Sequence, residues 1–404
     1  MKLEVNRLAM LEAARNVAKV APSLSKSDIL KKVLLETSDD TGEVYMTATN
    51  NQISIQHKVI ASVEESGSLL IDPALLVGMM AKLEGEIVSL SISPDKPEVL
   101  RVTAGRCVFQ INYHTAKGYP RPTMPFPEDS VIMTGICSLA KRTTFVVSQD
   151  ESKPALQCVQ VKLKSNAIHA AACDNARMML VKDSAEHTDE REFLLPGRSL
   201  QTLASISSDD DVFEVGDIGN EIVFVRGDMI FTIRKFITGS FIDVPALVKR
   251  LKPAYAAVVD VGNMKEGLNL VSVVALSGDK KKPVNLVLSG DGIILRCVVK
   301  ISESNSVVSA NVTKETPDTG FYYDVSALIK LFQVVGGRVK LEIDANGFMS
   351  VKTRNEAYFQ APVRPPVADE DEGEESEKQN KEQKQKRTKG AKDMKETAEP
   401  QEAA

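Results

Sequence analysis

The sequence predicts an α+β protein of three similar domains, each with two helices packed on an antiparallel sheet. A segment that ends a strand and begins an apolar helix occurs three times, at residues 70–76, 194–200 and 322–328. The leucines of these helices lie 124 and 128 residues apart, and the hairpin turns that follow lie 122 and 128 apart. The leucines are Leu76, Leu200 and Leu328, and the turns are at Gly105, Gly227 and Asn355. This period exceeds that of solenoid repeats, so each repeat is a domain that buries its own core.

The first domain is expected to open with a strand at residues 2–5 and a helix at residues 8–20. Apolar residues at helical spacing predict one buried face on that helix. The residues of this expected face are Leu8, Leu11, Ala14 and Ala18. Period-two segments follow, then a second helix at residues 73–83 and a closing hairpin around Gly105.

The second and third domains repeat this order. We expect helices at residues 138–148 and 198–206 in the second domain, and at 264–276 and 325–334 in the third. Prolines cluster at the joints between the domains. The expected borders are 1–126, 127–246 and 247–365 for the three domains, and 366–404 for a charged tail.

The tail differs in composition from the rest of the chain. An acidic block at residues 369–377 precedes a block rich in lysine and glutamine, and no aromatic residue occurs there. Such a segment buries too little apolar surface to order itself, so we expect disorder. Its position after Val363 and Arg364 allows two roles, a solubilising tether or a gate over a neighbouring site.

The charge of the chain is unevenly distributed. The formal net charge is −5, and residues 367–404 hold 12 acidic and 8 basic residues. The remainder therefore has 42 basic and 43 acidic residues. This balance predicts no strong attraction of the whole molecule to nucleic acid, so any DNA binding must depend on a local patch.

The chain is expected to be cytoplasmic and to have no membrane partner. It has no apolar run of the roughly 18 residues that a membrane span needs, and its first residues lack the pattern of a signal peptide. The cysteines are odd in number and lack C-x-x-C spacing, which favours reduced core thiols. They are Cys107, Cys137, Cys158, Cys173 and Cys297.

No catalytic or metal-binding motif is found. The four histidines are scattered, and phosphate-binding, dinucleotide-binding and nucleophile-elbow motifs are absent from the sequence. The run Asp209 to Asp211 lacks the glycine and terminal glutamate of a calcium loop. We therefore expect no catalytic residue, no metal and no cofactor, and a protein that is not an enzyme.

Lysine recurs in the loop after the first helix of each domain. The lysines are Lys26, Lys153, and Lys280, Lys281 and Lys282. If the domains are related by pseudo-rotation, these loops face one surface, which suits contact with phosphates without reading of bases. A solvated helix or loop surface is the alternative for each lysine taken alone.

Several segments, taken in order, resemble the bacterial sliding clamp, the β subunit of the replicative DNA polymerase III. They are the opening Met1-Lys2-Leu3, Gly118-Tyr119-Pro120, the turn Cys173-Asp174-Asn175-Ala176-Arg177, and the ending Ala361-Pro362-Val363-Arg364. The likeness covers about residues 1–365, and the ordered set is more specific than any single motif.

The resemblance implies a fold and a mechanism. Two subunits of a sliding clamp meet head to tail and close a ring, a homodimer, whose helices line a hole for duplex DNA. Such a clamp binds DNA without sequence specificity and acts as the processivity factor in DNA replication. Its implied partners are the DNA polymerase III α subunit, the clamp loader and other proteins with clamp-binding motifs. The alternatives are a clamp-like paralogue, or a scaffold that binds proteins without encircling DNA.

The resemblance also implies two sets of site residues. The partner-peptide pocket comprises Leu156, Cys173, Asn175, Ala176, Arg177, Met178, Ile242, Leu247, Phe359, Ala361, Pro362, Val363 and Arg364. The DNA-binding residues that the resemblance implies are Lys26, Lys82, Gln149 and Arg198. The recurrence of lysine in the loop after each domain's first helix adds Lys153, Lys280 and Lys281. The pocket turn departs from the family's usual Thr-Asp-Gly-His-Arg-Leu, which leaves the peptide preference open.

Overall fold

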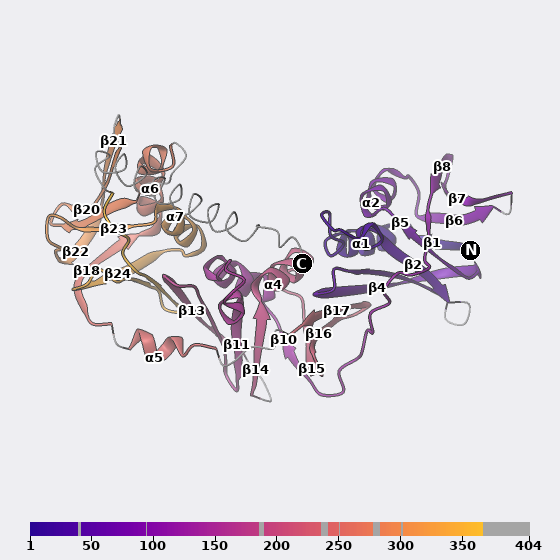
Figure 1. The fold of residues 1–404 in the computed structure, drawn as a ribbon, viewed down its shortest axis with the longest axis horizontal. Coiled ribbons are helices and arrows are strands. Elements are labelled where there is room, and N and C mark those ends of the chain that lie inside the picture. Colours follow the sequence, from indigo (N-terminus) through magenta and orange to yellow (C-terminus); the bar gives the residue numbers. More distant parts are fainter. Residues whose placement is uncertain are drawn as a thin grey trace, which may run out of the picture. The chain divides into compact units, whose positions relative to one another are not determined.

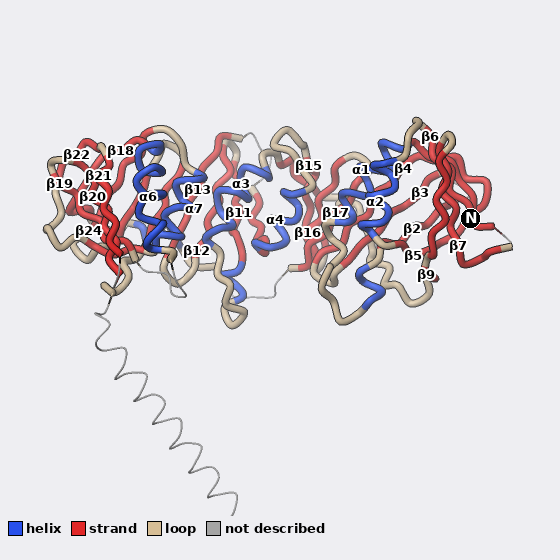
Figure 2. Tube along the Cα trace, turned by 90° about the horizontal axis from the view of Figure 1, so that it is seen from above, coloured by secondary structure: helices blue, strands red, loops and turns tan. Residues whose placement is uncertain are grey.

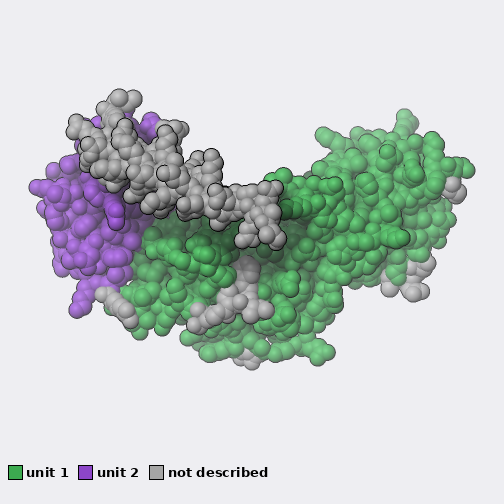
Figure 3. All heavy atoms as spheres, in the orientation of Figure 1, with its two compact units in different colours: residues 1–250, 352–359 green, residues 251–351, 360–404 purple. Residues whose placement is uncertain are grey.

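The computed structural model describes residues 1–38, 42–93, 95–185, 190–235, 241–249, 251–277, 283–299 and 302–366. It divides into two compact units, the first made of residues 1–250 and 352–359 and the second of the rest (Figure 3). The predicted Lys280 and Lys281, and the tail from residue 367, lie outside the described residues. Each unit combines helices with antiparallel sheets (Figure 1), which is the predicted α+β class.

A large antiparallel sheet runs through much of the first unit. Its strands are β1 (Lys2–Asn6), β2 (Val33–Ser38), β3 (Glu43–Thr49), β4 (Ile53–Glu65), β5 (Gly67–Ile71), β6 (Ile87–Ser93), β7 (Lys96–Ala104), β8 (Cys107–Asn112), β9 (His114–Thr115), β10 (Ser130–Met133), β15 (Phe213–Ile218), β16 (Glu221–Arg226) and β17 (Met229–Arg234). The main path is β10-β15-β16-β17-β4-β1-β6-β7-β8. At the junction of β4 and β17, Ile55 pairs with Phe231 and both are fully buried. The first two sequence repeats therefore share one continuous sheet.

A second sheet of the first unit supports the candidate site. Its strands are β11 (Cys158–Lys164), β12 (Ala167–Cys173), β13 (Arg177–Ser184), β14 (Arg191–Pro196) and the beginning of β26 (Glu356–Gln360). Their order is β14-β11-β12-β13-β26. Residue Lys182 of β13 donates its backbone N–H to the carbonyl of Asn355 at 2.8 Å. The segment at residues 352–359 is thus attached to a sheet formed about 170 residues earlier in the chain.

Two helix pairs pack in the first unit, α1 (Arg7–Ala18) with α2 (Pro73–Lys82), and α3 (Ile136–Thr143) with α4 (Gly197–Ser205) (Figure 2). The helices begin and end within a few residues of the predicted positions, except that α3 ends early and continues as a short 3-10 turn at Thr144–Val146. The prediction that Leu8 lies on the buried face of α1 is wrong, because its side chain is 61% exposed. The buried face instead contains Met10, Ala13, Ala14 and Val17 beside Leu11.

Helix starts differ between the repeats for a local reason. Asp72 caps α2 by accepting the N–H groups of Ala74 and Leu75. The equivalent helix α4 has Pro196 at its N-cap position, and proline has no side-chain acceptor, so α4 starts at Gly197 without a side-chain cap. A Cβ at Gly197 would lie 2.8 Å from Cγ2 of Val147, so close packing requires glycine there.

The second unit has its own helix pair and two sheet segments. Helix α6 (Val261–Ala275) packs on α7 (Val325–Val334), which Asp324 caps. The strands are β18 (Pro253–Asp260), β19 (Val284–Ser289), β20 (Gly292–Val299), β21 (Ser302–Val308), β22 (Ala310–Lys314), β23 (Phe321–Tyr323), β24 (Arg338–Asp344) and β25 (Met349–Lys352). Their orders are β25-β24-β18-β22 and β21-β20-β19-β23, which leaves β21 at an edge.

The cysteine prediction holds for four of the five thiols. None of the five forms a disulfide, and Cys137, Cys158, Cys173 and Cys297 are buried. Cys107 is exposed because it lies on β8, the last strand of the large sheet. Within the described residues, no helix has both the length and the apolar composition that crossing a membrane requires.

Candidate partner-binding and DNA-contact sites

A buried apolar cluster lies at one end of the second sheet of the first unit. Leu156, Cys173 and Val244 belong to it together with Ala171. Partly buried side chains pack against it, namely Met178, Leu180, Phe241 and Val248. We call these eight residues the apolar cluster. It brings together three predicted pocket residues, Leu156, Cys173 and Met178.

The thiol of Cys173 is an apolar component of this cluster. Its side chain is 2% exposed, and burial, with a smaller contribution from Asp174, raises the pKa of the thiol to about 11. Because the thiolate is the reactive form, Cys173 is an inert packing residue at neutral pH.

The turn after Cys173 is held by an internal ion pair. The guanidinium of Arg177 donates from Nε and Nη2 to Oδ2 of Asp174 at 2.8 and 2.6 Å. The other carboxylate oxygen of Asp174 accepts the N–H groups of Ala176 and Arg177. Asn175 and Ala176 are exposed at the tip of the turn. The turn therefore presents a fixed rim beside the apolar cluster, with Arg177 already paired.

A short helix, α5 (Val244–Val248), covers the cluster from the connecting segment. Its start is fixed by Asp243, whose side chain accepts the N–H of Ala246 at 3.1 Å. Val244 is fully buried, whereas the predicted pocket residues Ile242 and Leu247 are 41% and 37% exposed. These two side chains offer apolar surface to a bound molecule.

The predicted DNA-binding residues in the first unit occupy exposed positions. Lys26 lies in the loop after α1, Lys82 is the last residue of α2, and Gln149 follows the short 3-10 turn after α3. Arg198 on α4 donates to the amide oxygen of Gln149 at 3.1 Å, so the structure brings these two together.

Lys153 has a hydrogen-bond partner that the recurrence of lysine in the loops did not predict. Its ammonium donates to Oδ1 of Asn175 at 2.8 Å, which places this residue against the turn of the predicted peptide pocket. The side chain is exposed and keeps two donors for other acceptors.

Two family models match the chain. The model of the N-terminal domain of the DNA polymerase III beta subunit matches residues 1–125, and that of its central domain matches residues 133–243. Together they cover more than half of the sequence. The chain belongs to the DNA polymerase III beta-subunit family.

Relatives and solved structures agree with this family. The beta sliding clamp of Staphylococcus epidermidis is 22% identical over 364 residues, which cover 86% of this chain and 89% of that protein. The beta sliding clamp of Bacillus subtilis is 24% identical over 289 residues, covering 68% and 74%. The crystal structure of the Bacillus subtilis clamp superimposes with a TM-score of 0.78 at 19% identity, covering 91% of this chain and 100% of that one. A Pseudomonas aeruginosa clamp bound to griselimycin gives 0.76 at 19% identity, covering 90% and 99%.

The last predicted pocket residues of this beta-subunit chain divide between the units. Phe359 belongs to the first unit and is 2% exposed. The others belong to the second unit, where Val363 donates its N–H to the carbonyl of Tyr322 at 2.8 Å and is 36% exposed. These others are Ala361, Pro362, Val363 and Arg364. That they join the apolar cluster stays a prediction.

Sequence reasoning missed several members of the apolar cluster. Five of its residues were not among the predicted pocket residues, namely Ala171, Leu180, Phe241, Val244 and Val248. Strand alternation was an available signal for two of them, because Leu180 shares a face with Met178, and Ala171 shares one with Cys173. No local pattern indicated Phe241, Val244 and Val248, since their packing depends on how the connecting segment folds back.

The described residues of this beta-subunit chain contain no group of three His, Cys, Asp or Glu side chains placed to hold a metal ion. The aspartates considered above serve the fold. Asp211 pairs with Arg226, and Asp209 accepts the N–H of Ser138 at 2.6 Å.

Proposed function

We propose that this chain is a sliding clamp that encircles duplex DNA and tethers the replicative polymerase to it. Membership of the beta-subunit family is the observation that supports this function best. A closed ring holds DNA by topology, so weak and sequence-independent phosphate contacts suffice and allow sliding. On this proposal the chain is a non-catalytic subunit without a cofactor, and it acts where DNA is replicated, in the cytoplasm.

The proposed ring is a head-to-tail homodimer, in which the beginning of one copy meets the second unit of the other. Strands β8 and β21 support this arrangement, because among the described residues each is the last strand of its sheet and leaves backbone groups unpaired. Val108 on β8 is 51% exposed, and Val307 on β21 is 59% exposed. Helix α6 adds Leu270 and Val273, which are 63% and 73% exposed. Exposed apolar side chains beside two free sheet edges fit a contact between copies.

Exposed charges of opposite sign lie on the two edges. Arg101 and Arg106 are exposed on and beside β7, next to β8. Glu303 on β21 and Glu266 on α6 are exposed in the second unit. Pairing of opposite charges would set the head-to-tail orientation and disfavour like-with-like contact.

The apolar cluster is the proposed site for partner proteins. A short peptide with aliphatic side chains would contact Met178, Leu180 and Phe241, with Ile242 and Leu247 as further apolar contacts. The partners that we propose for it are the polymerase III α subunit, the clamp loader and other proteins with clamp-binding motifs.

Retention on circular DNA tests the ring directly. The protein is loaded on a nicked circular plasmid, separated from free protein by gel filtration, and analysed before and after one restriction cut. We expect the protein to be retained on the circle and released after linearisation, because the cut opens the topological link and changes no direct contact between protein and DNA. Equal retention on both forms would contradict the clamp, and a protein that elutes as a monomer and stays off the circle would favour the scaffold.

Removing a lining cation is expected to weaken DNA contact modestly. For Lys26→Ala the affinity for linear duplex DNA should fall at low salt. The slope of log K against log salt, which is negative, should become shallower by about 1, as expected for one lost phosphate contact. Fluorescence anisotropy across a salt series measures this. Lys164→Ala, which removes an exposed lysine from strand β11, is the control and should leave the slope unchanged. An unaltered low-salt affinity of Lys26→Ala would remove Lys26 from the proposed surface.

A further inference from the structure

One face of the second sheet changes from apolar to cationic in regular steps along β13. The strand register places Cys173 opposite Met178, then Ala171 opposite Leu180, then His169 opposite Lys182. On the other side of β12, Lys162 lies opposite His169. Because every second residue shares a face, all of these side chains lie on the same side of the sheet. We call Lys162, His169 and Lys182 the cationic row.

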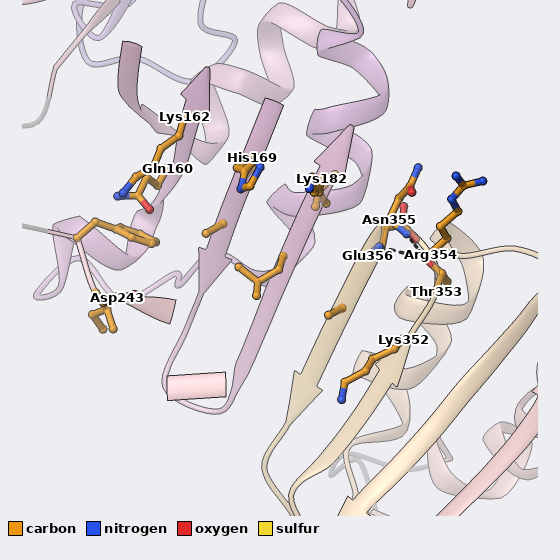
Figure 4. Close-up of a pocket in the computed structure, with 17 residues that line it drawn as sticks. Gln160, Lys162, His169, Lys182, Asp243, Lys352, Thr353, Arg354, Asn355 and Glu356 are labelled. Atoms are coloured by element: carbon orange, nitrogen blue, oxygen red, sulfur yellow. Dashed lines mark hydrogen bonds between the residues drawn. The ribbon is translucent and has the colours of Figure 1, made fainter. Parts of the chain in front are cut away.

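The cationic row lines a cavity that continues from the apolar cluster. The cavity has a volume of about 540 Å³ and includes Ala171, Leu180 and Phe241 of that cluster. Figure 4 shows His169 between Lys162 and Lys182, each on its own strand, with Asn355 and Arg354 beyond Lys182. A molecule that lies on the apolar cluster can therefore extend over the row without leaving the surface.

The charges of the row are unequally compensated. The ammonium of Lys162 lies 3.4 Å from Oε2 of Glu192 at one end of the row. Lys182 is exposed, and within the described part of the chain its ammonium has no ion-pair partner. The acidic residues that line the cavity are Asp243, which caps α5, and Glu356, which pairs with Arg142 at 3.3 Å. The row thus keeps net positive charge at Lys182.

The imidazole of His169 adds a neutral donor to this positive environment. Burial and the lysines Lys164, Lys182 and Lys162 lower its pKa. A neutral imidazole has one N–H donor and does not add to the repulsion between the two lysines of the row. A carboxylate placed above His169 would gain this donor and the uncompensated charge of the Lys182 ammonium.

We propose that the cationic row is a second subsite, which binds an acidic side chain of the same partner peptide whose aliphatic residues occupy the apolar cluster. This inference rests on the proposed peptide-binding function. The occupant is a peptide carboxylate because the site combines an apolar contact with a separate cationic one on a single strand face. Lys182 is four residues from Met178 along β13, about 13 Å at the usual strand rise. An extended peptide spans that distance with about four residues, which fixes the spacing between its aliphatic and acidic side chains.

The test uses short synthetic peptides labelled with fluorescein, each with a pair of leucines. Two probes carry a glutamate pair four residues before or four residues after the leucines, and matched probes carry glutamine there. Anisotropy with the full-length protein should show about fivefold tighter binding of one glutamate probe than of its glutamine match at low salt. The advantage should shrink in about 0.5 M salt because exposed charges are screened.

Variants then assign the preference to the row. Lys182→Gln should abolish the glutamate advantage while the glutamine probe binds as before, and Lys182→Glu should reverse the preference. Lys141→Gln removes an exposed lysine of α3 and is the matched control, in which the advantage should persist. If glutamate and glutamine probes bind the unaltered protein equally at both placements, the second subsite is wrong and the peptide site stands. If no probe binds at all, the proposed peptide site itself is wrong.

Discussion

If the proposed homodimer forms through α6, replacing Leu270 and Val273 together by aspartate is expected to convert it into monomers. The two side chains lie three residues apart on α6 and therefore on one face, and they are 63% and 73% exposed in the isolated chain. Burying each of them contributes roughly 1.5 to 3 kcal/mol at an interface, and a buried aspartate without a partner adds a further penalty. The dissociation constant should rise by at least about 100-fold, as measured by sedimentation equilibrium.

The control for this double variant is Leu24→Asp. Leu24 is 94% exposed in the loop after α1, so its replacement changes charge and hydrophobicity without touching the proposed interface. That variant should remain dimeric with the affinity of the unaltered protein. A Leu270 and Val273 variant that keeps its fold by circular dichroism and is still dimeric would place the subunit contact elsewhere.

Replacing Arg142 by methionine is expected to destabilise the first unit by about 3 kcal/mol. Its side chain is 13% exposed, and its guanidinium contacts both carboxylate oxygens of Asp183 on β13, one of them at 2.9 Å. It also lies 3.3 Å from Oε1 of Glu356, whose side chain is 12% exposed. Methionine would leave the Glu356 carboxylate largely buried without its charge partner, which is the costly outcome. Urea unfolding followed by circular dichroism measures the loss.

A surface ion pair serves as the control for Arg142→Met. Arg191 pairs with Asp129, whose side chain is 70% exposed. Arg191→Met should therefore cost less than about 1 kcal/mol. Adding Glu356→Gln to Arg142→Met should recover part of the loss, because a neutral amide is cheaper to bury than a carboxylate. Equal effects of Arg142→Met and Arg191→Met would show that the buried pair is not important for stability.

Local signals in the sequence predicted the helices well and the apolar cluster partly. Leucines at helical spacing predicted the helix positions, because this periodicity depends only on neighbouring residues. The structure adds that Asp72 and Asp324 cap two of these helices. Leu8 was placed on the wrong face, since the periodic pattern did not show that its side of α1 lacks a packing partner.

Contacts between distant residues were beyond sequence reasoning. Arg142 meets Asp183 and Glu356, which are 41 and 214 residues away, and nothing near Arg142 distinguishes it from an exposed helix cation. The joining of β4 to β17 likewise depends on the register of two strands from different repeats. The resemblance supplied Leu156, Cys173 and Met178, whereas the cationic row became visible only when the strand register aligned its three residues.

The measurement that tests the ring most directly is a covalent closure on DNA. Cys107 is exposed on the edge strand β8, and the other four native thiols are buried. The variant Asn305→Cys therefore adds a second accessible thiol, on the edge strand β21. The variant is loaded on nicked circular DNA, treated with a flexible bis-maleimide, and denatured with detergent. A ring closed at both contacts predicts subunits that stay linked to the circle in detergent and are released when the DNA is cut. Crosslinked dimers that leave the circle in detergent, or that stay bound after cutting, would contradict a clamp that encloses DNA.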